Sequence, residues 1–280
     1  QTTAKKAKLP SNSSVASASI SKAARTPLPI GASLSNTFFG PQANDIESGQ
    51  VVDSVTGDKS GLFSRHTLGV KYSVNKDLAV SAVGEGDIQH TMASGTSEAL
   101  GFTMRDPYIK IAKANLMTAN IKGNALAIDS QLRLFAPLGK ASRAADTIGK
   151  ASLWMVPTLN IGKSRFSLSA ENFVRYHVQS GKLHPKTQRV LTEMDVYTGP
   201  QLSYEISDSI SAFVLYEAAM TYDTLGRSEA NYAPTNSLCD LEPGVSLQIN
   251  KAFSVTPFLN WYTSQQLSTT SINVNATIKM

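Results

Sequence analysis

The chain has 280 residues, of which 41% are hydrophobic and 17% are charged. No run approaches the ~18 uninterrupted apolar residues that a membrane-spanning helix requires, so a helical membrane protein is excluded. The single cysteine, Cys239, excludes an internal disulfide framework.

The net charge of +5 comes from the N-terminal segment, residues 1–27, where all five charged residues before Asp45 are basic. Removing these five from the 26 Lys and Arg residues leaves 21, which equals the 21 Asp and Glu residues. The charge therefore describes a tail and not a basic binding face, and nucleic acid is not predicted as a partner.

The segment 1–27 is rich in Ser, Ala and Lys and has few apolar anchors, which predicts a flexible cationic segment. It is either a solvated leader or a segment that enters a lumen or contacts an acidic surface. The chain begins with Gln1, and we expect a mature form from which a secretory signal has been removed.

From Gly61 to the end of the chain the dominant pattern is an alternation of apolar and polar residues with a period of two, which indicates β-strands. The predicted barrel domain spans residues 28–280. In residues 165–178, Phe166, Leu168 and Val174 share one face, which Asn172 interrupts, while Arg175 lies on the other. Such runs are about 10 to 14 residues long, whereas strands of globular proteins are mostly about 5–6 residues. A tilted strand that crosses a bilayer needs about 9–11 residues, so the lengths favour transmembrane strands.

Twelve strands are predicted. Their ranges are Pro29–Phe39, Gly61–Val74, Leu78–Gln89, Leu100–Ala119, Ala125–Ala136, Ala151–Ile161, Arg165–Val178, Thr192–Ile206, Ile210–Tyr222, Glu242–Ile249, Phe253–Thr263 and Thr269–Met280. Within the fourth range, Asp106 and Pro107 interrupt the pattern, and Tyr108 to Asn120 could instead form a short helix. If this range is not a strand, the count of twelve fails.

The connections alternate between short polar turns, such as Asn75-Lys76-Asp77, and longer polar stretches, such as Pro137–Lys150 and Gln179–Leu191. Outer-membrane barrels join their strands in this way, with short periplasmic turns and long extracellular loops. The fold class predicted is therefore an all-β transmembrane antiparallel β-barrel of about 12 strands, with both termini on the periplasmic side.

Aromatic residues cluster near both ends of the predicted strands, on the apolar face, as expected for two girdles at the headgroup layers. Those near the short turns are Tyr72, Phe166, Tyr204 and Phe253, and those near the long loops are Phe38, Phe102, Tyr176, Tyr222 and Trp261. Strand ends are also rich in aromatic residues for other reasons, so this pattern alone does not decide the fold.

Prolines oppose the assignment, because a closed barrel has no edge strand where a missing N–H donor is harmless. Pro157 and Pro257 fall within strands, and Pro107 and Pro200 interrupt other runs. Each must lie at a bulge or at a position without a ladder hydrogen bond. Pro157, Pro200 and Pro257 fall on the apolar face, where kinks could shape a contact between subunits.

In this pattern, from about Pro29 to Met280, the chain resembles the porin-like outer-membrane β-barrel family of bacteria. Members usually end in an aromatic residue, whereas this final strand ends in Met280. A narrower resemblance is to the porin-like major outer-membrane proteins of Bdellovibrio-type predatory bacteria. The resemblance implies the outer membrane of a Gram-negative bacterium as the location.

The strand register predicts a set of charged residues that face the lumen. They are Arg65, Lys71, Glu85, Asp87, Asp129, Arg133, Glu171, Arg175, Asp195, Glu205, Glu217 and Lys279. Either they form ion pairs that fill the interior, or they line a water-filled pore whose opposed charges produce a weak ion selectivity. Basic residues of the long stretches are predicted to hold lipopolysaccharide headgroups or to favour anions at the entrance: Lys140, Arg143, Lys150, Lys182, Lys186 and Arg189.

No motif of a nucleotide-binding loop, a zinc site or a serine hydrolase is present, and the four histidines do not have the spacing of metal ligands. We therefore predict no catalytic residue, no metal and no cofactor. If the barrel were a hydrolase, His177, near Glu171 and Arg175, would be the best candidate for a catalytic residue.

The lead hypothesis is a porin-like passive channel for small solutes or ions, or a structural major protein of the outer membrane. It would be a homo-oligomer in contact with lipid, in which Ala212, Ala218 and Ala276 pack against a neighbour. The first alternative is the translocator barrel of an autotransporter, with the N-terminal segment in the lumen. The second is a soluble β-sandwich or solenoid whose apolar face points to a protein core.

Overall fold

The structure is a computed structural model that describes residues 29–42, 50–52, 59–90, 101–225, 228–230, 240–262 and 270–280. The predicted flexible segment, residues 1–27, lies outside the described residues.

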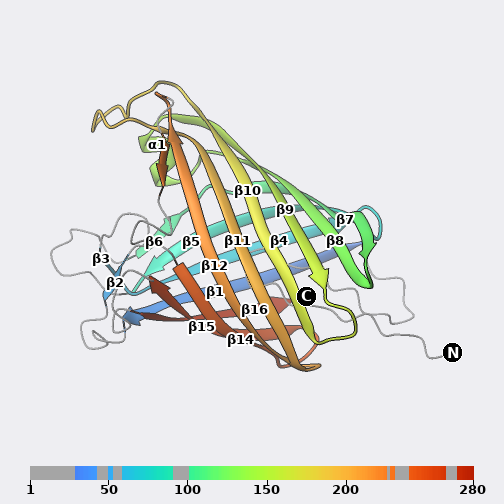
Figure 1. Cartoon of the computed structure of the whole chain (residues 1–280). Helices are drawn as coiled ribbons and strands as arrows, with labels where there is room; N and C mark the ends of the chain where they lie inside the picture. Colours follow the sequence, from blue (N-terminus) through green and yellow to red (C-terminus); the bar gives the residue numbers. More distant parts are fainter. Residues whose placement is uncertain are drawn as a thin grey trace.

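Twelve long antiparallel strands close into a barrel (Figure 1). In their order around the barrel they are β1 (Ile30–Gln42), β4 (Phe63–Ser73), β5 (Leu78–Gln89), β7 (Tyr108–Ile121), β8 (Asn124–Phe135), β9 (Thr147–Asn160), β10 (Phe166–Gln179), β11 (Thr192–Ser207), β12 (Ile210–Asp223), β14 (Asp240–Gln248), β15 (Phe253–Tyr262) and β16 (Ser271–Lys279). The first and last strands pair, with Leu34 opposite Ile278, so the sheet has no free edge. The predicted fold class is confirmed.

Four short strands lie outside this ring: β2 (Gln50–Val52) pairs with β3 (Lys59–Gly61), β6 (Gly101–Met104) extends β5, and β13 (Ser228–Ala230) extends β12. The strand predicted to begin at Gly61 begins at Phe63, because Gly61 belongs to β3. These additions lie at the long-loop end. The C-terminus lies at the opposite end, where Ala32 and Met280 exchange two backbone hydrogen bonds (Figure 1).

The doubtful fourth range is a strand and not a helix. Residues 105–107 separate β6 from β7, and Pro107 immediately precedes β7. Pro107 has no N–H to give to a ladder, which explains why the predicted single run divides there. The pairing of β7 with β8 contains an irregularity between Lys113 and Met117, where Asn115 has a φ of 50°.

One helix is described, α1 (Lys140–Ala144), within the predicted loop 137–150, and β9 begins four residues earlier than expected. Among the described residues, no helix is both long and apolar enough to cross a bilayer.

The two faces of the barrel have opposite polarity. On β10, Ser167 and Glu171 are buried, while Leu168 and Val174 on the other face are each 45% exposed. The same inversion is found on β8, where Gln131 and Arg133 are buried and Leu134 is exposed. A soluble β-sandwich would bury its apolar face, so this arrangement opposes the sandwich interpretation.

The strand prolines lie where one ladder is interrupted. Pro157 is opposite Ile128 of β8, but no residue between Met155 and Thr158 is paired with β10. Pro200 is likewise paired with β10 but not with β12. Pro243 and Pro257 are each paired on one side and unpaired across the β14–β15 seam. The missing N–H therefore costs little, because the ladder has no bond at that point.

Candidate functional site in the barrel lumen

Guanidinium groups lie against aromatic rings on the inner wall. The Cζ atom of Arg133 is 3.6 Å from the ring centroid of Trp154 and 5.4 Å from that of Tyr108. Arg133 is 3% exposed, and its Nε and Nη2 atoms donate to Gln131 Oε1 at 3.3 and 3.1 Å. The rings and the amide hold the cation in place within the lumen.

A second guanidinium, that of Arg175, lies between the rings of Phe135 and Phe173, with its Cζ atom 5.3 and 5.0 Å from their centroids. Phe173 is itself stacked on Tyr197 at 4.9 Å and contacts Trp154 at 4.3 Å. Inward side chains of β8 to β11 thus form one continuous band of rings and guanidinium groups around this side of the lumen.

A third guanidinium stands nearer the long-loop end. Arg65 Nε is 2.9 Å from Asp87 Oδ1, and Arg105 Nη1 is 3.1 Å from Asp87 Oδ2. The Cζ atom of Arg65 is also 5.3 Å from the Phe39 ring, which stacks on Phe63. One carboxylate therefore neutralises only one of the two guanidinium groups.

The acidic side of the lumen is formed by β12 and β14. Glu217, Asp240 and Glu242 lie together, and one oxygen of each is within 4.8 Å of the others. Tyr197 donates a short hydrogen bond to Glu217, and Asn260 Nδ2 donates to Asp240 Oδ2 at 2.6 Å and to Glu242 Oε1 at 2.9 Å.

Basic and acidic groups are only partly separated around the wall, since Glu85 and Asp87 lie among the basic groups. In the order of the ring, β12 and β14 lie across the barrel from β5 and β7, and the basic residues Arg65, Lys110 and Arg133 come from β4, β7 and β8. This partial separation of charge produces a field across the lumen.

The predicted lumen residues all have inward positions in the observed strand alternation, and the structure brings several of them together. Arg65 pairs with Asp87, Glu85 accepts from Tyr108 at 3.3 Å, and Arg175 lies 3.9 Å from Asp195. Glu171 is 7% exposed and its Oε2 atom has no hydrogen-bond partner. The remaining members, Lys71, Asp129, Glu205 and Lys279, lie nearer the short turns and outside the band. That any of them controls passage stays a prediction.

Several lumen residues were missed. Asp240 was assigned to a loop because the strand was expected to begin at Glu242, and Lys110 fell in the doubtful fourth range. The inward position of Glu242 follows from the alternation of its own strand, which was the signal available. The inward aromatic residues, such as Trp154 and Tyr197, were missed because aromatic residues were expected only on the outer face.

The predicted girdle residues have outward positions in the observed strands. Phe166 and Tyr204 pack against each other at 4.6 Å near the short turns, and Phe102 is 66% exposed at the other end. That these rings lie at headgroup layers stays a prediction.

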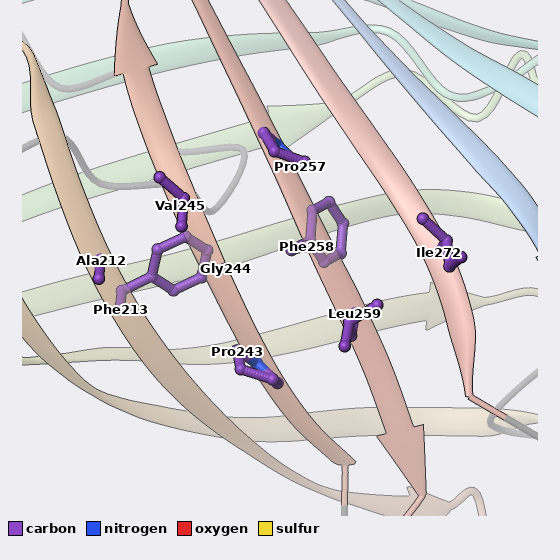
Figure 2. A pocket seen from close by; sticks show the side chains of 9 residues that line it. All are labelled: Ala212, Phe213, Pro243, Gly244, Val245, Pro257, Phe258, Leu259 and Ile272. Atoms are coloured by element: carbon purple, nitrogen blue, oxygen red, sulfur yellow. The ribbon is translucent and has the colours of Figure 1, made fainter. Parts of the chain in front are cut away.

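The outer wall carries a shallow hollow of about 440 Å³ over β12, β14, β15 and β16 (Figure 2). Its outward side chains include Ala212, Pro243, Val245, Pro257 and Leu259. On the lumen side, Gly244 leaves room for the Phe213 ring, from which a Cβ atom would be only 2.3 Å away. The hollow is apolar and lies on the face opposite to the lumen.

The long-loop end is fastened by a buried carboxylate, that of Asp106. It accepts from Lys150 Nζ at 2.6 Å, from Ser142 Oγ at 2.5 Å and from the Gly139 N–H at 2.7 Å. Burial alone would raise the pKa of Asp106, but the hydrogen bonds from Lys150, Ser142 and Gly139 outweigh it and lower the pKa below its ordinary value. Lys150 is one of the six basic residues predicted to hold lipopolysaccharide headgroups or to favour anions at the entrance, and it already has an acidic partner within the protein.

No family model matches the chain, and no characterised protein matches it in sequence. Among solved structures, a COG4313 outer membrane channel from Pseudomonas putida F1 is similar, with a TM-score of 0.59 and 10% identity over 91% of this chain and 97% of that chain. The KdgM porin matches with a TM-score of 0.43 and 8% identity over 89% and 98% of the two chains. At these identities the first comparison shows a shared barrel fold.

Proposed function

We propose that the protein is a porin-like channel of a Gram-negative outer membrane, through which small ions or solutes diffuse. The observation that carries this proposal is a closed barrel with an apolar outside and an inside that holds charged groups of both signs. An apolar outer face fits hydrocarbon, and a charged interior fits water. The similar solved channel supports the same location.

The passage is narrow. Arg133, Trp154, Phe213 and Glu171 are all buried, so these inward side chains are closely packed. Twelve strands lie between filled eight-stranded barrels and open sixteen-stranded porins. We therefore assign small ions as the principal cargo, with a weak preference set by the guanidinium groups.

Conductance in a planar bilayer tests the proposal. The full chain, refolded in detergent and checked by its heat-modifiable migration on a gel, should give stepwise openings. A folded sample that gives no openings at any protein concentration would contradict the channel and favour a structural barrel. The autotransporter alternative concerns residues 1–27, which lie outside the described residues, and no observation favours it.

The proposal includes no catalytic role. His177 Nε2 is 2.8 Å from Asp195 Oδ2 in the lumen, and this His–Asp pair has no serine among its hydrogen-bond partners within the described residues. On the outer face, Ser64 Oγ is 2.9 Å from His66 Nε2, but Ser64 is only 3% exposed, so its hydroxyl is covered. Hydrolysis of a chromogenic ester by the refolded protein would contradict this assignment.

We also propose a homo-oligomer with lipid contacts. The hollow beside Pro243 and Pro257 gives the outer wall a place for a neighbour's side chains or an acyl chain. Lys140, Arg143, Lys182, Lys186 and Arg189 are exposed on the long loops, where lipopolysaccharide phosphates would lie. Native mass in detergent tests the first point, and a strictly monomeric protein would contradict it.

A further inference from the structure

Three carboxylates converge on the inner wall. Glu217 and Asp240 are directly opposite each other on β12 and β14, and Glu242 follows two residues later on the same face. One oxygen from each lies within 4.8 Å of the other two. Oxygens bound to one Ca²⁺ lie about 2.3–2.6 Å from it, so ligands on opposite sides are separated by up to about twice that distance. The spacing fits a shared calcium ion.

The hydrogen-bond donors around these carboxylates do not balance their charge. Within the described part of the chain, none of the three takes part in an ion pair. Asp240 is 1% exposed, and its Oδ1 atom is buried without a hydrogen-bond partner. Asn260 Oδ1, beside it, is also buried without a partner. Buried charges in proteins are normally paired or bound to a metal.

We propose that Glu217, Asp240 and Glu242, with the side-chain amide of Asn260, form a binding site for Ca²⁺ in the barrel lumen. Asn260 now donates its N–H groups to two of the carboxylates, and a half-turn of its amide would present Oδ1 to the ion in their place. Water molecules complete the coordination of 6–8 oxygens that Ca²⁺ takes.

The ligand set selects among cations. The cluster contains neither histidine nor cysteine, the ligands that structural zinc sites prefer. Mg²⁺ requires near-ideal octahedral geometry at about 2.0–2.1 Å and keeps several waters, so it is held by one or two carboxylates and not by three. Three convergent carboxylates and an amide therefore favour the larger ion.

A bound Ca²⁺ would change the charge of the wall beside the guanidinium band. The three formal negative charges would be reduced to one, so the lumen as a whole would become more positive. This electrical consequence rests on the proposed channel function. The binding of the ion does not.

Binding is tested on the full chain refolded in detergent free of lipopolysaccharide, with Tb³⁺ as a luminescent substitute for Ca²⁺ and Tyr197 as the neighbouring sensitiser. We expect saturable luminescence at one Tb³⁺ per chain, which Ca²⁺ displaces at concentrations where Mg²⁺ does not. Absence of a saturable signal, or equal displacement by Mg²⁺, would overturn the proposal. Neither result depends on conductance, so the test separates this proposal from the channel.

A pair of matched variants tests the location. Glu242→Gln should lose the Tb³⁺ signal and the rise of Tm with Ca²⁺, while Glu205→Gln, a lumen carboxylate of β11 outside the cluster, should keep both. In the presence of a chelator, Glu242→Gln should melt no lower than the wild type, because one repelling charge has been removed. Equal loss in both variants, or an unchanged signal in Glu242→Gln, would overturn the site.

Discussion

The side-chain amide of Asn172 on β10 donates to the backbone carbonyl of Met155 on β9, at 3.3 Å. It also donates to the Ala170 carbonyl at 3.1 Å, and Thr198 donates to its Oδ1 atom at 2.7 Å. These contacts lie on the outer face, beside the interruption of the ladder at Pro157. The polar residue that breaks the apolar pattern of β10 thus satisfies carbonyl groups that a proline-containing strand leaves open.

Replacing Asn172 should therefore destabilise the barrel, although the replacement makes the outer face more apolar. We expect Asn172→Leu to cost about 1–3 kcal/mol, because carbonyl groups on the hydrocarbon-facing side of the wall lose their donors. Ala170→Leu, a neighbouring outward position, should change stability by less than about 0.5 kcal/mol. Urea unfolding in lipid vesicles measures both. A more stable Asn172→Leu variant would show that the amide has no structural role.

Because the apolar face points outward, we expect the cost of a charged substitution on that face to depend on its depth in the membrane. Leu153, in the middle of β9, is 52% exposed, and Val178, an outward residue near the long-loop end of the neighbouring β10, is 44% exposed. Leu153→Arg should cost about 2–4 kcal/mol in a bilayer, and Val178→Arg about 0–1 kcal/mol, because the penalty for a cation falls toward the interface. Equal costs at the two positions would argue against a membrane-spanning β9.

The strand count and the orientation of the faces could be predicted because each strand repeats the same two-residue period over a length set by a bilayer. Leu168 and Val174 show this period in the sequence of one strand, so no partner strand needs to be known. The interruptions could not be interpreted in the same way. The polar Asn172 on the outer face is accounted for by the ladder interruption at Pro157, and this is visible only once β9 and β10 are paired. A single strand does not contain that information.

The lumen was predictable in part for the same reason. Arg133 and Glu217 follow from strand parity, but the contact of Arg133 with Trp154 depends on the register between β8 and β9, in which Gln131 lies opposite Trp154. Asp240 was missed because a strand's first residue has no preceding alternation to identify it. Asp106 and Lys150 meet only through the folding of two separate loops.

The guanidinium band makes a third prediction, about ion selectivity. Arg133→Gln removes a cation from the narrow part of the lumen and leaves the Trp154 ring without its partner. We expect a larger conductance and a reversal potential shifted toward cations in a salt gradient, because the positive wall is weakened. Arg165→Gln, at an exposed short turn, is the control and should leave the reversal potential unchanged. The same shift in both variants would mean that the effect is not local to the band.

The carboxylate of Asp106 makes a fourth prediction, about pH. Because its pKa is lowered in the folded state, its contribution to stability is complete above the ordinary Asp value of about 3.9 and is lost as the pH falls through the folded value. Asp106→Asn removes charge-assisted hydrogen bonds from Lys150 and Ser142 and should cost about 1.5–3 kcal/mol near neutral pH. The difference in Tm between wild type and variant should then shrink below pH ~4.

Asp146→Asn is the matched control for Asp106→Asn, since Asp146 lies in the same loop region with an exposed side chain. Its Tm should follow that of the wild type at every pH. If the Tm of Asp106→Asn stayed equally far below that of the wild type at the lowest pH at which the barrel is folded, the charge of Asp106 would not be what stabilises the contact between the start of β7 and helix α1. The shape of the side chain would then be the cause.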